Sequence, residues 1–147
     1  MKAVITCKLN IPARHAWQRV KQSQTLVYVC KGLLSFENSE DFPAQWQENL
    51  RIQSRLKFFG LIPGWQHSIH FIRLSDAAMT LRTRESGAMV RTWDHEISIQ
   101  HASATCCFYT DSVDIEAGLL TPLVWLFAQA LYRYRQRRWR SFTGGLS

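Results

Sequence analysis

From residue 34 to residue 116, apolar and polar positions alternate with a period of two, which is typical of antiparallel strands that bury one face. The clearest run covers 46–58, where mainly apolar residues occupy every second position. Turn signals lie at 61–64, 75–76 and 86–87. The pattern therefore predicts strands at 34–36, 46–58, 65–74, 78–85, 90–100 and 104–116.

Other segments flank this region. Residues 2–10 alternate as a first strand, and two short helices are predicted at 12–22 and 24–30, the first with a proline in its first turn. After Gly118 a long helix is predicted over 120–140. Its apolar positions are Leu123, Phe127, Ala130, Leu131 and Tyr134, widened by Val124, Trp125 and Leu126.

The predicted order is one strand, two short helices, about six further antiparallel strands and a long terminal helix. We therefore predict a single α+β domain over 1–147, in which a curved antiparallel sheet of about six or seven strands wraps around the terminal helix. A helix across the concave face encloses an interior, which side chains fill or a ligand occupies.

The charge of the chain is concentrated at one end. The sequence has 18 Lys and Arg against 11 Asp and Glu, a formal net charge of +7. Five arginines lie between Arg133 and Arg140, so residues 1–131 are close to neutral. A nucleic-acid-binding face needs a more distributed basic patch, so we do not expect nucleic acid as a partner.

The apolar segments and cysteines exclude further classes. The N-terminal apolar run is shorter than that of a signal peptide, and 117–131 is too short to cross a bilayer, so we expect a soluble, cytoplasmic protein. Cys7, Cys30, Cys106 and Cys107 show no C-x-x-C spacing. We expect reduced structural thiols, no metal site and no cofactor.

The order of elements and several short motifs resemble the SRPBCC superfamily, which includes START lipid-transfer domains, the birch-pollen-allergen fold, coenzyme-Q-binding proteins and polyketide cyclase-like proteins. The motifs are NIPARHAW at 10–17, LIPGWQH at 61–67, RTWDH at 91–95, YTDSVDI at 109–115 and the helix from Leu120 to Trp139. The resemblance spans the chain and implies a helix-grip fold around a ligand cavity. It implies no single activity, because members of one fold differ in function.

The period of two also assigns strand residues to faces. If Ile97 points inward, for example, Trp93 and His95 do so as well. The first hypothesis is therefore a protein that binds a lipid, an isoprenoid quinone or an aromatic metabolite. The predicted ligand-binding residues are Trp65, His67, Phe71, Met79, Leu81, Glu85, Trp93, His95, Ile97, Tyr109, Asp111, Val113, Leu123 and Phe127.

Five of these residues are polar although their face is otherwise apolar: His67, Glu85, His95, Tyr109 and Asp111. An unpaired buried polar group costs about 1–3 kcal/mol, so we expect them to pair with one another, contact water or contact a ligand. The second hypothesis is an aromatase/cyclase-type enzyme with His95, Asp111 and Tyr109 as acid–base groups. No nucleophile elbow or phosphate-binding loop supports catalysis, which favours binding.

The arginine-rich end of the terminal helix gives a third hypothesis. Arg135, Arg137, Arg138 and Trp139 combine cations with an aromatic ring, a composition suited to an anionic membrane surface or another partner. The alternative is a solvated helix end whose arginines compensate for the helix dipole. Ligand identity and oligomeric state are not determined by the sequence.

Overall fold

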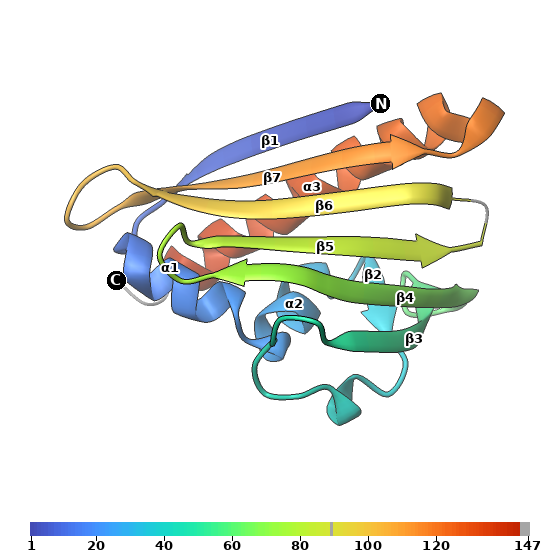
Figure 1. The fold of residues 1–147 in the computed structure, drawn as a ribbon, viewed down its shortest axis with the longest axis horizontal. Helices are drawn as coiled ribbons and strands as arrows, with labels where there is room; N and C mark the ends of the chain where they lie inside the picture. The colour runs from blue at the N-terminus through green and yellow to red at the C-terminus, as the bar shows by residue number, and fades with distance from the viewer. Residues whose placement is uncertain (89, 145–147) are drawn as a thin grey trace.

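The computed structural model of the chain, which describes residues 1–88 and 90–144, contains a curved antiparallel sheet packed against a long helix (Figure 1). In chain order the elements are β1 (Lys2–Leu9), α1 (Ala13–Val20), α2 (Ser23–Cys30), β2 (Leu34–Phe36), the 3-10 turn η1 (Ser39–Asp41), β3 (Arg51–Phe58), β4 (Ile62–Ser75), β5 (Thr80–Gly87), β6 (Val90–His101), β7 (Cys107–Glu116), the 3-10 turn η2 (Gly118–Leu120) and α3 (Thr121–Gly144).

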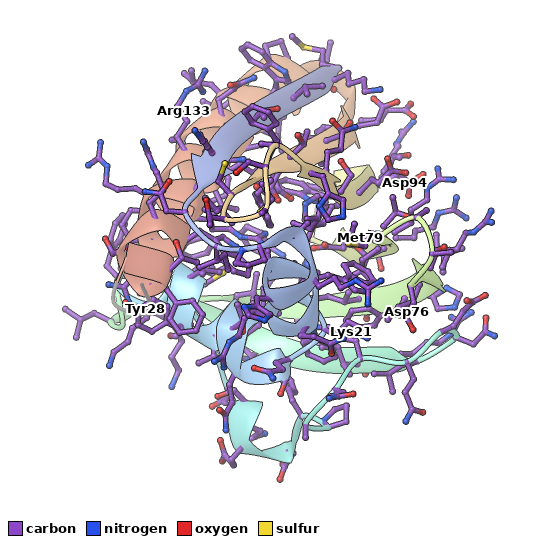
Figure 2. All side chains as sticks on the ribbon, turned by 90° about the vertical axis from the view of Figure 1, so that its left-hand side faces the viewer. Lys21, Tyr28, Asp76, Met79, Asp94 and Arg133 are labelled. Atoms are coloured by element: carbon purple, nitrogen blue, oxygen red, sulfur yellow. The ribbon has the colours of Figure 1, made fainter. Side chains whose placement is uncertain are left out.

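The seven strands form one sheet in the order β1-β7-β6-β5-β4-β3-β2. The register shifts within the β3–β4, β4–β5 and β5–β6 pairs, and such bulges increase the bend and twist of a sheet. The sheet curls around α3, while α1 and α2 lie at one end of its concave side (Figure 2). The predicted α+β helix-grip fold is confirmed.

The long strand predicted at 46–58 begins later than expected, at Arg51. Asn49 has a φ of 67°, which breaks the extended conformation before the strand. The Trp46 N–H donates to the Lys21 carbonyl oxygen, and the Asn49 N–H donates to that of Phe71. Residues 46–50 are therefore a loop, in which Trp46 is buried and Leu50 partly buried while the three residues between them are exposed.

Two turn predictions are displaced. The chain reverses at Phe59 and Gly60, both with positive φ, and not at 61–64. Pro63 lies inside β4, at a position that β5 does not reach, so its missing N–H breaks no bond with that strand. Met79, predicted in a strand, lies in the β4–β5 turn with a φ of 49°.

Two apolar clusters make up the core, and a polar row separates them along the inward faces of β6 and β7. Ile97 and Tyr109 belong to the cluster under α1 and α2, whereas Trp93 and Val113 belong to the cluster under the first half of α3. His95 and Asp111 lie between them, and the β6–β7 register runs without a shift from Thr92 to His101. Because no bulge interrupts this pair, every inward residue keeps its predicted face.

Among the described residues, no helix is long and apolar enough to cross a membrane.

Candidate functional site

A cavity of about 360 Å³ lies between the concave face of the sheet and the helices α2 and α3. Aromatic rings dominate its wall: Trp46, Trp65, Trp93, Trp139, Phe36, Phe58, Phe71 and Phe127. Aliphatic side chains such as Val29, Leu56 and Ile97 complete it. The side chains therefore leave the interior partly unfilled, and the space has the size and apolar lining of a small-molecule site.

The cavity reaches the surface between β4 and the start of α3. Trp65 and Leu123 both line the cavity, and 36% and 65% of their respective surfaces are exposed. Figure 1 places the start of β4 and the start of α3 at the same end of the molecule, opposite the C-terminus. Further exposed apolar side chains occur beside these two residues in the chain: Leu61, Ile62, Leu119 and Leu120. An apolar molecule thus meets apolar side chains at the opening.

Most residues that the alternation predicted to bind a ligand line this cavity: Trp65, His67, Phe71, Leu81, Glu85, Trp93, His95, Ile97, Tyr109, Leu123 and Phe127. Asp111 and Val113 point inward from β7 and are fully buried, but they do not form part of the cavity wall. Met79 is also not part of the wall, because it lies in a turn near Asp76 at the end of the sheet (Figure 2). The structure therefore places these three predicted residues outside the cavity wall.

Apart from Leu123 and Phe127, the residues on the helical side of the wall were not predicted from the sequence. Helix α2 contributes Thr25, Leu26, Val29 and Cys30, and α3 contributes Val124, Leu131, Tyr132, Arg135 and Trp139. Leu131, Arg135 and Trp139 recur every four residues, so they share one face of α3. The sequence shows this four-residue spacing, but Arg135 at its centre is charged, so the predicted apolar stripe included only Leu131 of the three.

Of the four residues predicted to form an arginine-rich surface, Arg135 and Trp139 are buried, whereas Arg137 and Arg138 are not. Arg135 and Trp139 are only 6% and 2% exposed, so the prediction that they lie on a surface is wrong. The Arg138 guanidinium donates to the Tyr28 carbonyl oxygen at 3.0 Å and lies 4.3 Å from the centre of the Tyr28 ring. Arg137 is exposed. A helix rotates about 100° per residue, so neighbouring arginines point in different directions.

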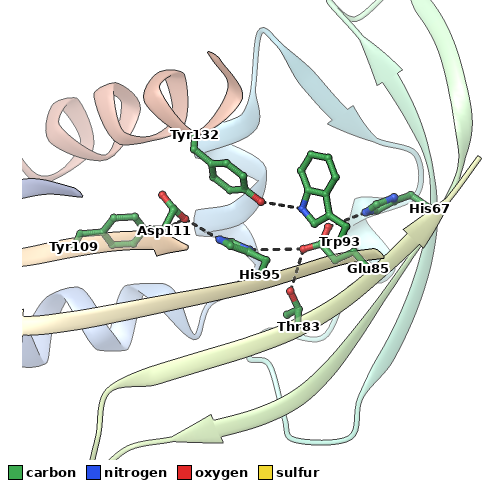
Figure 3. A network of polar contacts seen from close by, with 8 residues as sticks. All are labelled: His67, Thr83, Glu85, Trp93, His95, Tyr109, Asp111 and Tyr132. Carbon is green, nitrogen blue, oxygen red and sulfur yellow. Dashed lines mark hydrogen bonds and ion pairs between the residues drawn. The ribbon is translucent and has the colours of Figure 1, made fainter. Parts of the chain in front are cut away.

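The buried polar residues pair with one another in a network that borders the cavity (Figure 3). His95 lies at its centre, with Nε2 2.9 Å from Asp111 Oδ1 and Nδ1 3.7 Å from Glu85 Oε1. His95 thus lies between two carboxylates, one on β5 and one on β7. The remaining contacts are His67 Nε2 to Glu85 Oε2 (2.8 Å), Thr83 Oγ1 to Glu85 Oε1 (3.0 Å), Tyr109 OH to Asp111 Oδ1 (3.0 Å) and Gln136 Nε2 to Asp111 Oδ2 (3.0 Å).

The network alters the pKa values of its members in opposite directions. Burial alone lowers the pKa of His95, but hydrogen bonds to Asp111 and Glu85 outweigh it and raise that pKa. Burial alone raises the pKa of Glu85, but hydrogen bonds from His67 and His95 lower it well below its usual range. The pKa of Asp111 is also lowered, because the Arg135 charge and the His95 hydrogen bond outweigh burial. These directions favour two ionised carboxylates, with His95 and Arg135 as the neighbouring positive charges.

Neither thiols nor metal ligands are arranged for chemistry in the described residues. No three His, Cys, Asp or Glu side chains of 1–88 and 90–144 are grouped as a metal site. The four cysteines are free, and burial raises the pKa of Cys30 in the cavity wall to about 11. This thiol stays protonated at neutral pH and is a poor nucleophile.

A long helix held by a curved antiparallel sheet, with a cavity between them, is the fold of START-like proteins of the SRPBCC superfamily. A START superfamily protein from Mycobacterium smegmatis has 11% identity and a TM-score of 0.74, with 99% of each chain covered. The Zhui aromatase/cyclase from Streptomyces sp. R1128 has 10% identity and a TM-score of 0.70, with 98% of this chain and 93% of that chain covered. Norcoclaurine synthase from Thalictrum flavum has 10% identity and a TM-score of 0.66, with 97% and 86% covered.

Residues 7–142 match the family described as "Domain of unknown function (DUF8410)", and the chain belongs to this family. No functionally curated protein matches the sequence. The structural similarities, all at low identity, establish the fold alone.

Proposed function

We propose that the protein binds a small, mainly apolar molecule in the cavity between the sheet and α3. The observation that carries this proposal is the unfilled space of about 360 Å³ with a chiefly aromatic and aliphatic wall. Burial of a ligand there supplies about 25 cal/mol for each Å² of apolar surface removed from water. Lipids, isoprenoid quinones and aromatic metabolites all have the required apolar surface.

Two of the structurally similar proteins support this proposal by analogy. One is a START superfamily protein, and the norcoclaurine synthase structure is a complex with dopamine and hydroxybenzaldehyde. The residues proposed to contact the apolar part of a ligand are those that line the cavity near its opening and along its wall: Trp65, Phe71, Leu81, Trp93, Ile97, Leu123 and Phe127.

The network geometry favours binding over aromatase/cyclase-type catalysis. A general base needs an imidazole nitrogen with a free lone pair. Both ring nitrogens of His95 face carboxylates, and these contacts raise its pKa, which favours the doubly protonated ring. This arrangement supports a role for His95 as the buried cation that holds Glu85 and Asp111 together.

Native mass spectrometry of the freshly purified protein tests the proposal, followed by extraction and identification of any bound compound. The second part of the experiment is titration with Nile red, a neutral apolar fluorophore. We expect Leu81→Trp, which inserts a larger side chain into the wall, to weaken Nile red binding about tenfold or more. Leu126→Trp is the matched control, because Leu126 lies on α3 and is 61% exposed.

If the wild-type protein carries no compound and binds no neutral apolar probe, the proposal fails. Equal Nile red affinity in wild type and Leu81→Trp also contradicts it, provided that circular dichroism shows both to be folded.

A further inference from the structure

Arg135 is a buried cation that forms no hydrogen bond or ion pair with any described residue. Its side chain lines the cavity, and only 6% of the residue is exposed. Its Nε is buried and donates no hydrogen bond, and no ion pair joins the guanidinium to any residue of 1–88 or 90–144. A guanidinium carries five N–H donors and stays charged at all physiological pH values. Burial without acceptors is costly, so a ligand acceptor placed there gains a strong, charge-assisted interaction.

Arg135 forms no hydrogen bond or ion pair with Asp111 or Glu85, whose carboxylate oxygens contact other described side chains instead. Asp111 and Glu85 are occupied by His95, Tyr109, Gln136, His67 and Thr83. Arg135 interacts with Asp111 only at longer range, where its charge helps to lower the pKa of that carboxyl group. The protein thus supplies charge compensation nearby but leaves the guanidinium donors unused.

Tyr132 provides a second unused donor one helical turn earlier. The Arg135 guanidinium carbon lies 5.1 Å from the centre of the Tyr132 ring, so the ring fixes the position of the cation. The Tyr132 hydroxyl oxygen accepts a hydrogen bond from Trp93 Nε1 at 3.0 Å (Figure 3). Its own proton is donated to no acceptor in the described part of the chain. Both residues line the cavity.

We propose that Arg135 and the Tyr132 hydroxyl bind a carboxylate group of the ligand, an inference that rests on the proposed function above. The planar guanidinium fork matches the two oxygens of a carboxylate. A doubly charged phosphate fits less well, because the Asp111 carboxylate is nearby and a single guanidinium supplies only one positive charge. The ligand class is therefore a monocarboxylate with an apolar body.

The position of Arg135 along α3 indicates how this ligand lies. Arg135 follows Leu123 by twelve residues, so the rise of an α-helix separates them by about 18 Å. Leu123 is at the opening of the cavity. The carboxylate thus binds at the inner end, and the apolar body extends along the aromatic wall toward the opening.

Isothermal titration calorimetry with two matched ligand pairs tests this inference: dodecanoate with 1-dodecanol, and 2-naphthoate with 2-naphthol. Near neutral pH we expect wild type to bind at least one acid about tenfold or more tightly than its alcohol. Arg135→Met should abolish that preference, because it removes the cation. Arg137→Met, on the exposed side of the same helix, should keep the preference. The first pair has the carboxylate on an aliphatic chain and the second has it on an aromatic ring, so the two pairs show which kind of apolar body the cavity accepts.

The outcomes separate this inference from the proposed function. If wild type binds the acid and alcohol of each pair equally, or if Arg135→Met retains the preference, the carboxylate site is refuted while apolar ligand binding stands. If neither member of either pair binds and Nile red does not bind, the proposed function and the inference both fail.

A measurement on wild type alone covers the case in which Arg135→Met does not fold. With ¹³C-carboxyl-labelled dodecanoate, or labelled 2-naphthoate if only that binds, we expect the bound carboxyl resonance to keep its ionised chemical shift from about pH 8 to about pH 5.5. A carboxyl group in an apolar cavity without a cation has a raised pKa and titrates inside this range. Such a titration would overturn the inference.

Discussion

Asp111 offers the sharpest test of the buried network. It is 0% exposed and accepts hydrogen bonds from His95 at 2.9 Å and from Tyr109 and Gln136 at 3.0 Å. Asp111→Asn keeps the shape of the side chain but replaces one oxygen by an NH₂ group. In either orientation of the amide, that NH₂ group faces at least one N–H or O–H donor, and His95 loses one of its two counter-charges.

Removal of one partner from a buried ion pair costs about 3–5 kcal/mol. Because the amide retains one acceptor, we expect Asp111→Asn to lower the free energy of unfolding by about 3 kcal/mol. For a protein of this size, that change lowers Tm by roughly 6–12 °C. Urea denaturation near neutral pH, followed by tryptophan fluorescence, measures the loss. NMR titration of His95 provides a second readout, and its pKa should fall because the Asp111 hydrogen bond raises it.

Asp114→Asn is the matched control on the same strand. Its side chain is 67% exposed and, among the described residues, forms an ion pair only with the N-terminal ammonium group, at 3.6 Å. We expect a change of less than about 0.5 kcal/mol. If Asp111→Asn costs less than about 1 kcal/mol, or if the two variants behave alike, Asp111 is not the buried counter-charge of His95.

Three further predictions concern pH, packing and the thiols. The free energy of unfolding should fall below about pH 4, because folding lowers the pKa of Glu85. It should also fall as the pH rises from about 6.5 through the raised pKa of His95, because the unfolded imidazole loses its proton first. A urea midpoint that is flat across this range would contradict both signs. Phe71→Ala should cost about 3–5 kcal/mol because Phe71 is 2% exposed, whereas Phe108→Ala, at 41% exposed, should cost less than about 1 kcal/mol in the same assay. Cys30 should react with a disulfide reagent near pH 8 only after unfolding, because burial raises its pKa to about 11, and rapid labelling of the native thiol would show that this part of the wall opens.

The inward residues of the strands were predictable because side-chain direction along a strand depends on local backbone geometry alone. The alternation correctly placed Trp93, His95 and Ile97 on one face, and it placed Tyr109 beside Asp111 on the next strand. Bulges shift the register in three strand pairs, but none falls in the β6–β7 pair that carries these residues. The sequence therefore predicted that polar residues lie in this part of the interior.

The orientation of α3 was not predictable in the same way. Its first half is apolar nearly all round, so the sequence did not specify which side faces the sheet. The predicted stripe included Ala130 and Tyr134, but Ala130 is exposed and Tyr134 donates to the Lys31 carbonyl oxygen. The buried stripe instead runs through Arg135.

By itself, the sequence determined the order of elements, the α+β class and the inward faces of the central strands, because these follow from the periods of two and 3.6 along the chain. Only the tertiary structure decided that the interior contains a cavity, that His95 joins Glu85 to Asp111, and that Arg135 lies inside without a hydrogen-bond or ion-pair partner among the described residues. The physical reason is that each of these features depends on distances between residues far apart in the chain. The packing of α3 against the curved sheet sets those distances, and no local pattern encodes them.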